Sequence, residues 1–176
     1  DRNLVWPQVN LGRAPQDFKS DGEDSQLIIG DHNEFRENVT IHKGTDNGGG
    51  ATRIGHHNML MVGSHIAHDC VLGDHIILAN NILLAGHVHI HDHSVISGAC
   101  ALHHYVTVGA YGFIGGMTRV VHDTPPFVII EGNPARVRGV NVIGLERHRF
   151  STTAIDNLKN AYRKLFRNSS CESLTM

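Results

Sequence analysis

The sequence lacks the long apolar runs that a membrane-spanning segment needs. Its longest runs, such as residues 76–79 and 127–130, are far shorter than the roughly 20 residues that cross a bilayer. No N-terminal stretch combines a charged start, an apolar middle and a small-residue cleavage site. We therefore predict no transmembrane segment. Because the chain opens on Asp1 rather than Met and ends in a polar stretch, we expect it to be a fragment from which a targeting segment can be missing.

Cysteine and net charge are scarce as well. The 3 cysteines are an odd number without CxxC spacing, which argues against a disulfide framework and against a cysteine zinc site. Their scarcity favours a reducing compartment. A formal net charge of -2 provides no basic field for nucleic acid, so we predict no nucleic-acid partner.

The chain does contain a strict six-residue repeat. Between Ile54 and Val120 an aliphatic residue occupies every sixth position, and Ile29, Phe35 and Ile41 keep the same step earlier in the chain. The repeated positions, called anchors below, are Ile54, Leu60, Ile66, Leu72, Leu78, Leu84, Ile90, Ile96, Leu102, Val108, Ile114 and Val120. A helix repeats near 3.6 residues and a strand near 2, so a period of six predicts short strands that turn a corner once per hexad.

Three such hexads close one triangular coil, and stacked coils bury the anchors in a column. We therefore predict an all-β solenoid of parallel strands. Small residues follow many anchors, as at Gly55, Gly73 and Gly109, where a tight corner leaves little room for a side chain. The pattern does not determine the hand of the coil.

The N-terminal part of the repeat is interrupted. Residues 1–28 are expected to hold an incomplete coil with Val9 as a candidate anchor, followed by a polar loop around Asp17, Lys19 and Gly22. After Ile41 the next anchor comes thirteen residues later, so residues 43–53 must loop out from a corner. Such a loop either contributes to a binding face or is a tolerated solvent loop.

The six-residue repeat ends after Val120, and from Ser151 the apolar residues recur with the period of a helix. Ser151 is placed to cap a helix whose apolar stripe is Ile155, Leu158, Tyr162, Leu165 and Phe166. We predict a β-helix domain over residues 1–150 and the start of a C-terminal helical region over residues 151–176.

Histidines supply the densest chemistry. In coils of 18 residues, His68, Gly86 and His104 stack in one column, and His87 and His103 lie close to it. A histidine beside a carboxylate, as in His68-Asp69, is suited to act as a general base. The backbone N–H of Gly86 is suited to face a developing oxyanion. Most other histidines of the repeat are expected to be solvated surface groups: His56, His57, His75, His89, His91 and His93.

Zinc binding is an alternative chemistry for these histidines. In gamma-type carbonic anhydrases the zinc ligands follow a pattern of one histidine, a second histidine two coils later and a third histidine five residues after that. His68 and His104 fit the first two positions, but the third position is Gly109. We therefore predict no metal site.

Cys70 and Cys100 are candidates for a covalent nucleophile, although the hexad pattern favours a buried, structural thiol at Cys70.

Six segments together carry a resemblance to a known family. They are residues 41–45 (IHKGT), 48–50 (GGG), 65–70 (HIAHDC), 78–81 (LANN), 84–87 (LAGH) and 139–141 (GVN). Over about residues 1–167 the chain resembles the UDP-N-acetylglucosamine acyltransferases, which make the first acyl transfer of lipid A biosynthesis.

The resemblance implies a cytoplasmic homotrimer of left-handed parallel β-helices with active sites between subunits. It implies acyl carrier protein carrying a 3-hydroxyacyl chain as donor, the glucosamine 3-hydroxyl of UDP-N-acetylglucosamine as acceptor, and no cofactor. His68 matches the general base, Asp69 the carboxylate that orients it, and Gly86 the oxyanion donor.

The remaining matches concern substrate binding. His65, His87 and His103 match histidines that shape the site and contact the sugar nucleotide or the acyl chain. Asp17 and Lys19 match an acidic and a basic residue that hold substrate from the neighbouring subunit. Asn141 and Arg147 match nucleotide or phosphate contacts. Gly116 matches the position that measures acyl length, where glycine leaves room for a long chain of about fourteen carbons by analogy with the family.

The chain departs from the family pattern where nucleotide contacts are expected. His104 stands in place of a glutamine and Ile143 in place of an acidic residue. A 3-amino sugar nucleotide as acceptor, a CoA-dependent transferase on another sugar nucleotide, and a catalytically silent scaffold are therefore the alternatives to the favoured reaction.

Overall fold

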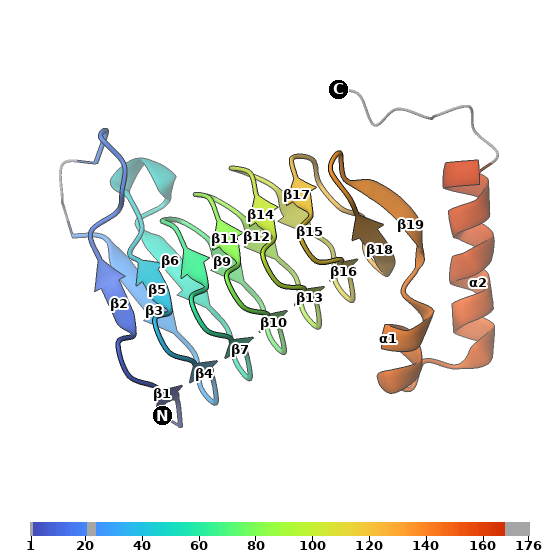
Figure 1. The fold of residues 1–176 in the computed structure, drawn as a ribbon, viewed down its shortest axis with the longest axis horizontal. Coiled ribbons are helices and arrows are strands. Elements are labelled where there is room, and N and C mark those ends of the chain that lie inside the picture. The colour runs from blue at the N-terminus through green and yellow to red at the C-terminus, as the bar shows by residue number, and fades with distance from the viewer. Residues whose placement is uncertain (1, 21–23, 168–176) are drawn as a thin grey trace.

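The computed structural model describes residues 2–20 and 24–167, which form a solenoid of stacked triangular coils followed by helices (Figure 1). Three sheets make its sides. The first has eight strands in the order β1 (Leu4–Val5), β4 (Glu34–Phe35), β7 (Met59–Leu60), β10 (Ile77–Leu78), β13 (Val95–Ile96), β16 (Phe113–Ile114), β18 (Val128–Glu131) and β19 (Arg136–Val140).

The other two sheets contain the remaining strands. The second sheet runs β17 (Arg119–Val120), β14 (Ala101–Leu102), β11 (Leu83–Leu84), β8 (His65–Ile66), β5 (Thr40–His42) and β2 (Asn10–Arg13). The third runs β15 (Thr107–Val108), β12 (His89–Ile90), β9 (Val71–Leu72), β6 (Ala51–Ile54) and β3 (Gln26–Ile29). All neighbours pair in parallel except β18 and β19, which are antiparallel. The fold is the left-handed parallel β-helix that the family resemblance implies.

The anchors form the core, as the six-residue repeat predicts. From Phe35 to Val120 every anchor is at most 3% exposed. A second buried column lies two residues before the anchors and includes Cys70, Ile76, Ile82 and Val88. Burying a Leu or Ile side chain contributes about 1.5–3 kcal/mol, so stacking stabilises two-residue strands that would not persist alone.

The corners contain residues with positive φ. At every sixth position from His57 to Met117 the φ angle lies between 57° and 71°, and only Gly63 among these positions is glycine. Asn, Asp and His are the side chains that best tolerate this left-handed conformation, but Tyr, Ala and Met also occur here. The glycines after the anchors are required for space rather than for a positive φ. A Cβ on Gly30, for example, would lie 2.6 Å from the Gly55 carbonyl oxygen.

The N-terminal segment differs from the sequence-based expectation. Strands β1, β2 and β3 pair with β4, β5 and β6, so this segment contributes all three sides of a coil. The register aligns Val5 with Phe35 and Leu11 with Ile41, so Val5 and Leu11, and not Val9, stand at the anchor register, although both are exposed. Val9 is partly buried and packs against the core. Gly22, expected in the polar loop, lies outside the described residues.

Two insertions leave the solenoid at the same corner. The loop between β2 and β3 carries Asp17 and Lys19, and the loop between β5 and β6 contains the 3-10 turn η1 (Asp46–Gly48). Both join the second sheet to the third, and Figure 1 shows them at the N-terminal end of the solenoid. They therefore lie near the corner that carries Asp69.

The C-terminal part turns helical. Helix α1 (Val142–Arg147) precedes α2 (Thr152–Tyr162), and a π-helical turn, η2 (Arg163–Arg167), follows it. As predicted, Ser151 caps α2: its hydroxyl accepts the Ala154 N–H at 3.2 Å. Within the described residues, none of these helices is long and apolar enough to span a bilayer.

Candidate active site

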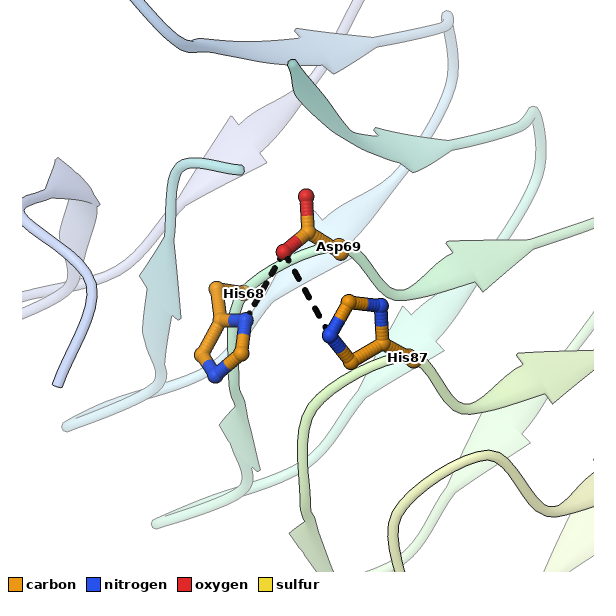
Figure 2. Close-up of side chains that lie close together, drawn as sticks. All are labelled: His68, Asp69 and His87. Carbon is orange, nitrogen blue, oxygen red and sulfur yellow. Dashed lines mark hydrogen bonds and ion pairs between the residues drawn. The ribbon is translucent and has the colours of Figure 1, made fainter. Parts of the chain in front are cut away.

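The centre of the site is a buried histidine–carboxylate pair. Nδ1 of His68 lies 2.8 Å from Oδ2 of Asp69, and the same oxygen lies 3.8 Å from Nε2 of His87 (Figure 2). Asp69 is 3% exposed and His68 7%. Because Nδ1 of His68 is engaged by the carboxylate, Nε2 is the ring atom left to exchange a proton with a ligand.

The coil length brings these residues together. His68 and Asp69 follow β8, and the backbone N–H of His87 donates to the carbonyl of His68 at 3.0 Å, one coil on. Tyr105 donates to the carbonyl of Gly86 at 3.2 Å, so His68, Gly86 and His104 stack as the 18-residue spacing predicts. The His87 ring stacks on Tyr105 with centroids 4.4 Å apart.

Gly86 lies directly against the His68 ring. A Cβ at this position would lie 2.6 Å from Cε1 and 2.7 Å from Nε2 of His68. Among the described residues none accepts a hydrogen bond from the Gly86 N–H, so this donor remains available beside Nε2. The Gly86 backbone thus lies next to the base, and a nearby backbone donor is what acyl transfer uses to stabilise an oxyanion.

The Asp69 carboxylate is stabilised in its ionised form. Burial alone would raise the pKa of Asp69, but hydrogen bonds from Thr45 and His68 and the nearby His87 ring outweigh burial and lower it. The Thr45 hydroxyl donates to Oδ2 at 2.7 Å and its backbone N–H donates to Oδ1 at 2.8 Å. Thr45 is not among the predicted site residues, although it ends the segment 41–45 (IHKGT) that carries part of the family resemblance.

Burial favours the neutral form of two neighbouring histidines. Burial lowers the pKa of His87; the Asp69 carboxylate opposes this, and the His68 and His104 rings add to it. Burial also lowers the pKa of His65, whose Nδ1 lies 2.7 Å from the Thr40 hydroxyl.

An open cleft of about 510 Å³ lies on the outer face of the second sheet and is lined by His68 but not by Asp69 or His87. Five of the predicted residues line it: His65, His68, Gly86, His103 and His104. Its floor is apolar, with Leu83, Ala85 and Ala101. Gln16 and Arg119 also line the cleft, and neither was singled out from the sequence.

The other predicted binding residues lie outside this lining. Asp17 accepts the Lys19 N–H at 3.0 Å and lies close enough to His87 to raise its pKa electrostatically. Gly116 is exposed, and a Cβ there would meet only the Gly98 carbonyl oxygen at 3.5 Å and Ser97 Cβ at 4.0 Å. This glycine therefore has free space around it.

Asn141 and Arg147 lie on the C-terminal side. Asn141 caps α1 by accepting the Gly144 N–H at 3.1 Å, and its amide donates to the Tyr111 carbonyl at 2.9 Å. Arg147 is exposed at the end of the same helix. Their contacts with a nucleotide stay predictions.

One group could hold a metal ion. Ligand atoms of His68, Asp69 and His87 all lie within 4.8 Å of one another. A metal here would have to displace the His68–Asp69 hydrogen bond, because both atoms of that bond would become ligands. The zinc arrangement considered from the sequence would also need a third donor at Gly109, which has none.

The two cysteines of the repeat are structural. Both are fully buried, and burial raises the pKa of the Cys70 thiol to about 12 and also raises the pKa of Cys100. The Cys70 thiol donates to the Ala85 carbonyl at 3.2 Å. A thiolate nucleophile is therefore disfavoured, as the hexad pattern predicts for Cys70.

Three of the histidines outside the cleft form an aromatic column. The rings of His57 and His75 stack with centroids 4.9 Å apart, and those of His75 and His93 at 4.8 Å. Most of the histidines expected to be surface groups are exposed: His56, His57, His75, His89 and His91. His93 is the exception, because it is partly buried against His148, and burial lowers its pKa.

Comparisons with known proteins identify the family of this chain. A family model for UDP N-acetylglucosamine O-acyltransferase, domain 2, matches residues 123–175. The chain is 44% identical over 165 residues to the acyl-[acyl-carrier-protein]–UDP-N-acetylglucosamine O-acyltransferase of Synechocystis sp., an alignment that covers 94% of the chain. It spans 59% of that relative's length.

Two solved structures extend the likeness to the fold. The UDP-N-acetylglucosamine acyltransferase of Bacteroides fragilis superposes with a TM-score of 0.94 at 40% identity, covering 96% of this chain and 66% of that one. The enzyme of the same name from Campylobacter jejuni gives 0.85 at 36% identity, covering 95% of this chain and 74% of that one. The chain therefore belongs to the UDP-N-acetylglucosamine acyltransferase family.

Proposed function

We propose that this protein transfers a 3-hydroxyacyl chain from acyl carrier protein to the glucosamine 3-hydroxyl of UDP-N-acetylglucosamine, the first step of lipid A biosynthesis. The observation that carries the proposal is the placement of His68 Nε2 against Gly86, whose N–H has no acceptor within the described part of the chain, in an open cleft. The relative from Synechocystis sp. is named for this reaction, which supports the choice of donor and acceptor.

In the proposed mechanism His68 is the general base. Nε2 accepts the proton of the sugar hydroxyl while the oxygen attacks the thioester carbonyl carbon. Asp69 accepts the hydrogen bond from Nδ1–H, fixes the ring and stabilises the imidazolium that forms.

Gly86 completes the chemistry. Its N–H donates to the carbonyl oxygen as that oxygen gains negative charge. When the tetrahedral intermediate collapses, the C–S bond breaks, the ester remains on the sugar, and the imidazolium returns its proton to the thiolate of the carrier. No acyl-cysteine forms, in agreement with the raised thiol pKa of Cys70.

The proposal includes a homotrimer with sites between subunits. One chain supplies a cleft that is open to solvent and a loop whose Phe18 is fully exposed between Asp17 and Lys19. A neighbouring subunit would cover such surfaces, and Asp17 and Lys19 would hold substrate from the neighbouring subunit. Asn141 and Arg147 would contact the nucleotide or its phosphates. A carrier-protein donor places the enzyme in the cytoplasm.

The proposal also assigns the long acyl chain to the space around Gly116, which is open in the structure. The division into a β-helix domain, residues 1–150, and the start of a helical region, residues 151–176, belongs to the same proposal.

The test compares the intact native protein with its His68→Ala variant, using 3-hydroxyacyl carrier protein and UDP-N-acetylglucosamine. The rate is expected to fall by about 10²- to 10⁴-fold. His91→Ala, which removes an exposed histidine outside the cleft, is the matched control and should retain the native rate. Turnover only with acyl-CoA, or only with the 3-amino acceptor, would change the assigned substrates, and a fully active His68→Ala variant would overturn the assigned base.

A further inference from the structure

We propose that Thr45 is a positioning residue that holds the Asp69 carboxylate in the orientation His68 needs, an inference that rests on the proposed function. Thr45 lies in the loop between β5 and β6, which interrupts the six-residue repeat. It is 4% exposed and has no place in the mechanism above.

Thr45 contacts both oxygens of the carboxylate. Its hydroxyl donates to Oδ2 of Asp69 at 2.7 Å and its N–H donates to Oδ1 at 2.8 Å. Oδ2 is the oxygen that also binds Nδ1 of His68. Two donors from one residue on two oxygens fix the rotation of the carboxylate, which one bond to the His68 ring would leave free.

The loop is built to present Thr45 in this way. The N–H groups of Gly48 and Gly50 both donate to the Thr45 carbonyl, at 3.1 and 2.9 Å, so the loop closes on this residue. At the start of the loop, the Gly44 N–H donates to the carbonyl of Gln26 at 3.0 Å, which ties it to the preceding coil.

Gly48 shows how closely the loop approaches. A Cβ at Gly48 would overlap the carboxyl carbon and both oxygens of Asp69. Its φ is not in the left-handed region, so glycine is needed here for space rather than for backbone conformation. On the other side, the Thr52 hydroxyl accepts the Asp69 backbone N–H at 2.8 Å. The loop thus contacts the carboxylate at Thr45 and packs against it at Gly48, while Thr52 in β6 holds the Asp69 backbone.

The arrangement has a consequence for His68. Hydrogen bonds to a carboxylate favour its charged form, and an ionised, fixed Asp69 keeps the proton of His68 on Nδ1 and leaves Nε2 as the base. Without the Thr45 hydroxyl the Asp69 carboxylate loses one hydrogen-bond donor and can rotate. Fewer molecules then hold the His68 ring in the reactive orientation.

The experiment uses two variants of the intact protein. Thr45→Val replaces the hydroxyl with a methyl group, and Thr45→Ser keeps the hydroxyl and removes the methyl group. The kcat of Thr45→Val is expected to fall about 10- to 100-fold with little change in KM, and Thr45→Ser should recover most of it. Asn47→Ala, an exposed position in the same loop, is the matched control and should keep native kcat.

A second readout does not depend on turnover. NMR titration of the Asp69 carboxyl carbon, assigned with Asp69→Asn, should show a higher pKa in Thr45→Val than in the native protein and a native pKa in Thr45→Ser. If the native protein does not turn over, this titration still decides the role of Thr45, while the proposed function falls. An unchanged carboxyl pKa, or a Thr45→Val variant with native kcat, would overturn the inference. The same holds for a loss of kcat that Thr45→Ser fails to recover.

Discussion

Replacing Gly86 by alanine tests the contact between backbone and base on which the site depends. The new Cβ would lie 2.6 Å from Cε1 of His68, whereas ordinary contacts begin near 3.4 Å, so the ring must move by about 0.8 Å. The ring cannot move freely, because Asp69 holds Nδ1 at 2.8 Å. The backbone at Gly86 is not in the left-handed region, so alanine should not strain the coil itself.

The expected effect follows from this displacement. A misplacement of about 1 Å in a catalytic group costs on the order of 10²-fold in rate, which corresponds to about 2.7 kcal/mol. Because the N–H of residue 86 is retained, the loss should come from the position of the base. We expect kcat to fall about 100-fold and KM to change little.

Initial rates of acyl transfer, measured over a range of acceptor concentrations, separate kcat from KM. Gly139→Ala is the matched control, since a Cβ there would meet no atom within 4 Å. Thermal unfolding of both variants shows whether the fold is kept. A Gly86→Ala variant with native kcat, or an equal loss in Gly139→Ala, would refute the reasoning.

Three further predictions follow. Burial lowers the pKa of four histidines in the folded protein: His42, His65, His87 and His93. Because these histidines titrate near 6.5 in the unfolded chain, the unfolded chain binds more protons than the folded one as the pH falls through about 6.5. Tm should therefore decrease from pH 7.5 to 5.5, and a flat or rising Tm would contradict this. Dialysis against a chelator should leave acyl transfer unchanged, whereas a loss that zinc restores would assign a metal to His68, Asp69 and His87. Cys70, with its thiol pKa raised to about 12, should resist alkylation at pH 8 in the native protein but react after denaturation, as peptide mass spectrometry would show, and Cys70→Ala should retain transfer.

The repeat determines the solenoid and much of the site. A period of six fixes which side chains point inward, and the anchors from Phe35 to Val120 are buried accordingly. Three hexads per coil fix the vertical register, which places Gly86 against His68 without any knowledge of side-chain contacts. The change of period at Ser151 likewise marks the start of α2.

The N-terminal coil shows where the repeat stops being informative. Between Leu11 and Ile29 the two positions that keep the step of six are the acidic residues Asp17 and Glu23, so no aliphatic anchor marks the repeat there. Strand pairing places Val5 and Leu11 opposite Phe35 and Ile41.

The sequence by itself determined the column of anchors, the stacking of His68 with Gly86 and His104, and the pairing of a histidine with a carboxylate, because each depends only on spacing along a regular coil. Tertiary structure alone decided that Thr45 donates to both oxygens of Asp69 and that Gly48 leaves room for that carboxylate. The physical reason is that an inserted loop has no period, so its path depends on hydrogen bonds and close contacts with coils distant in sequence.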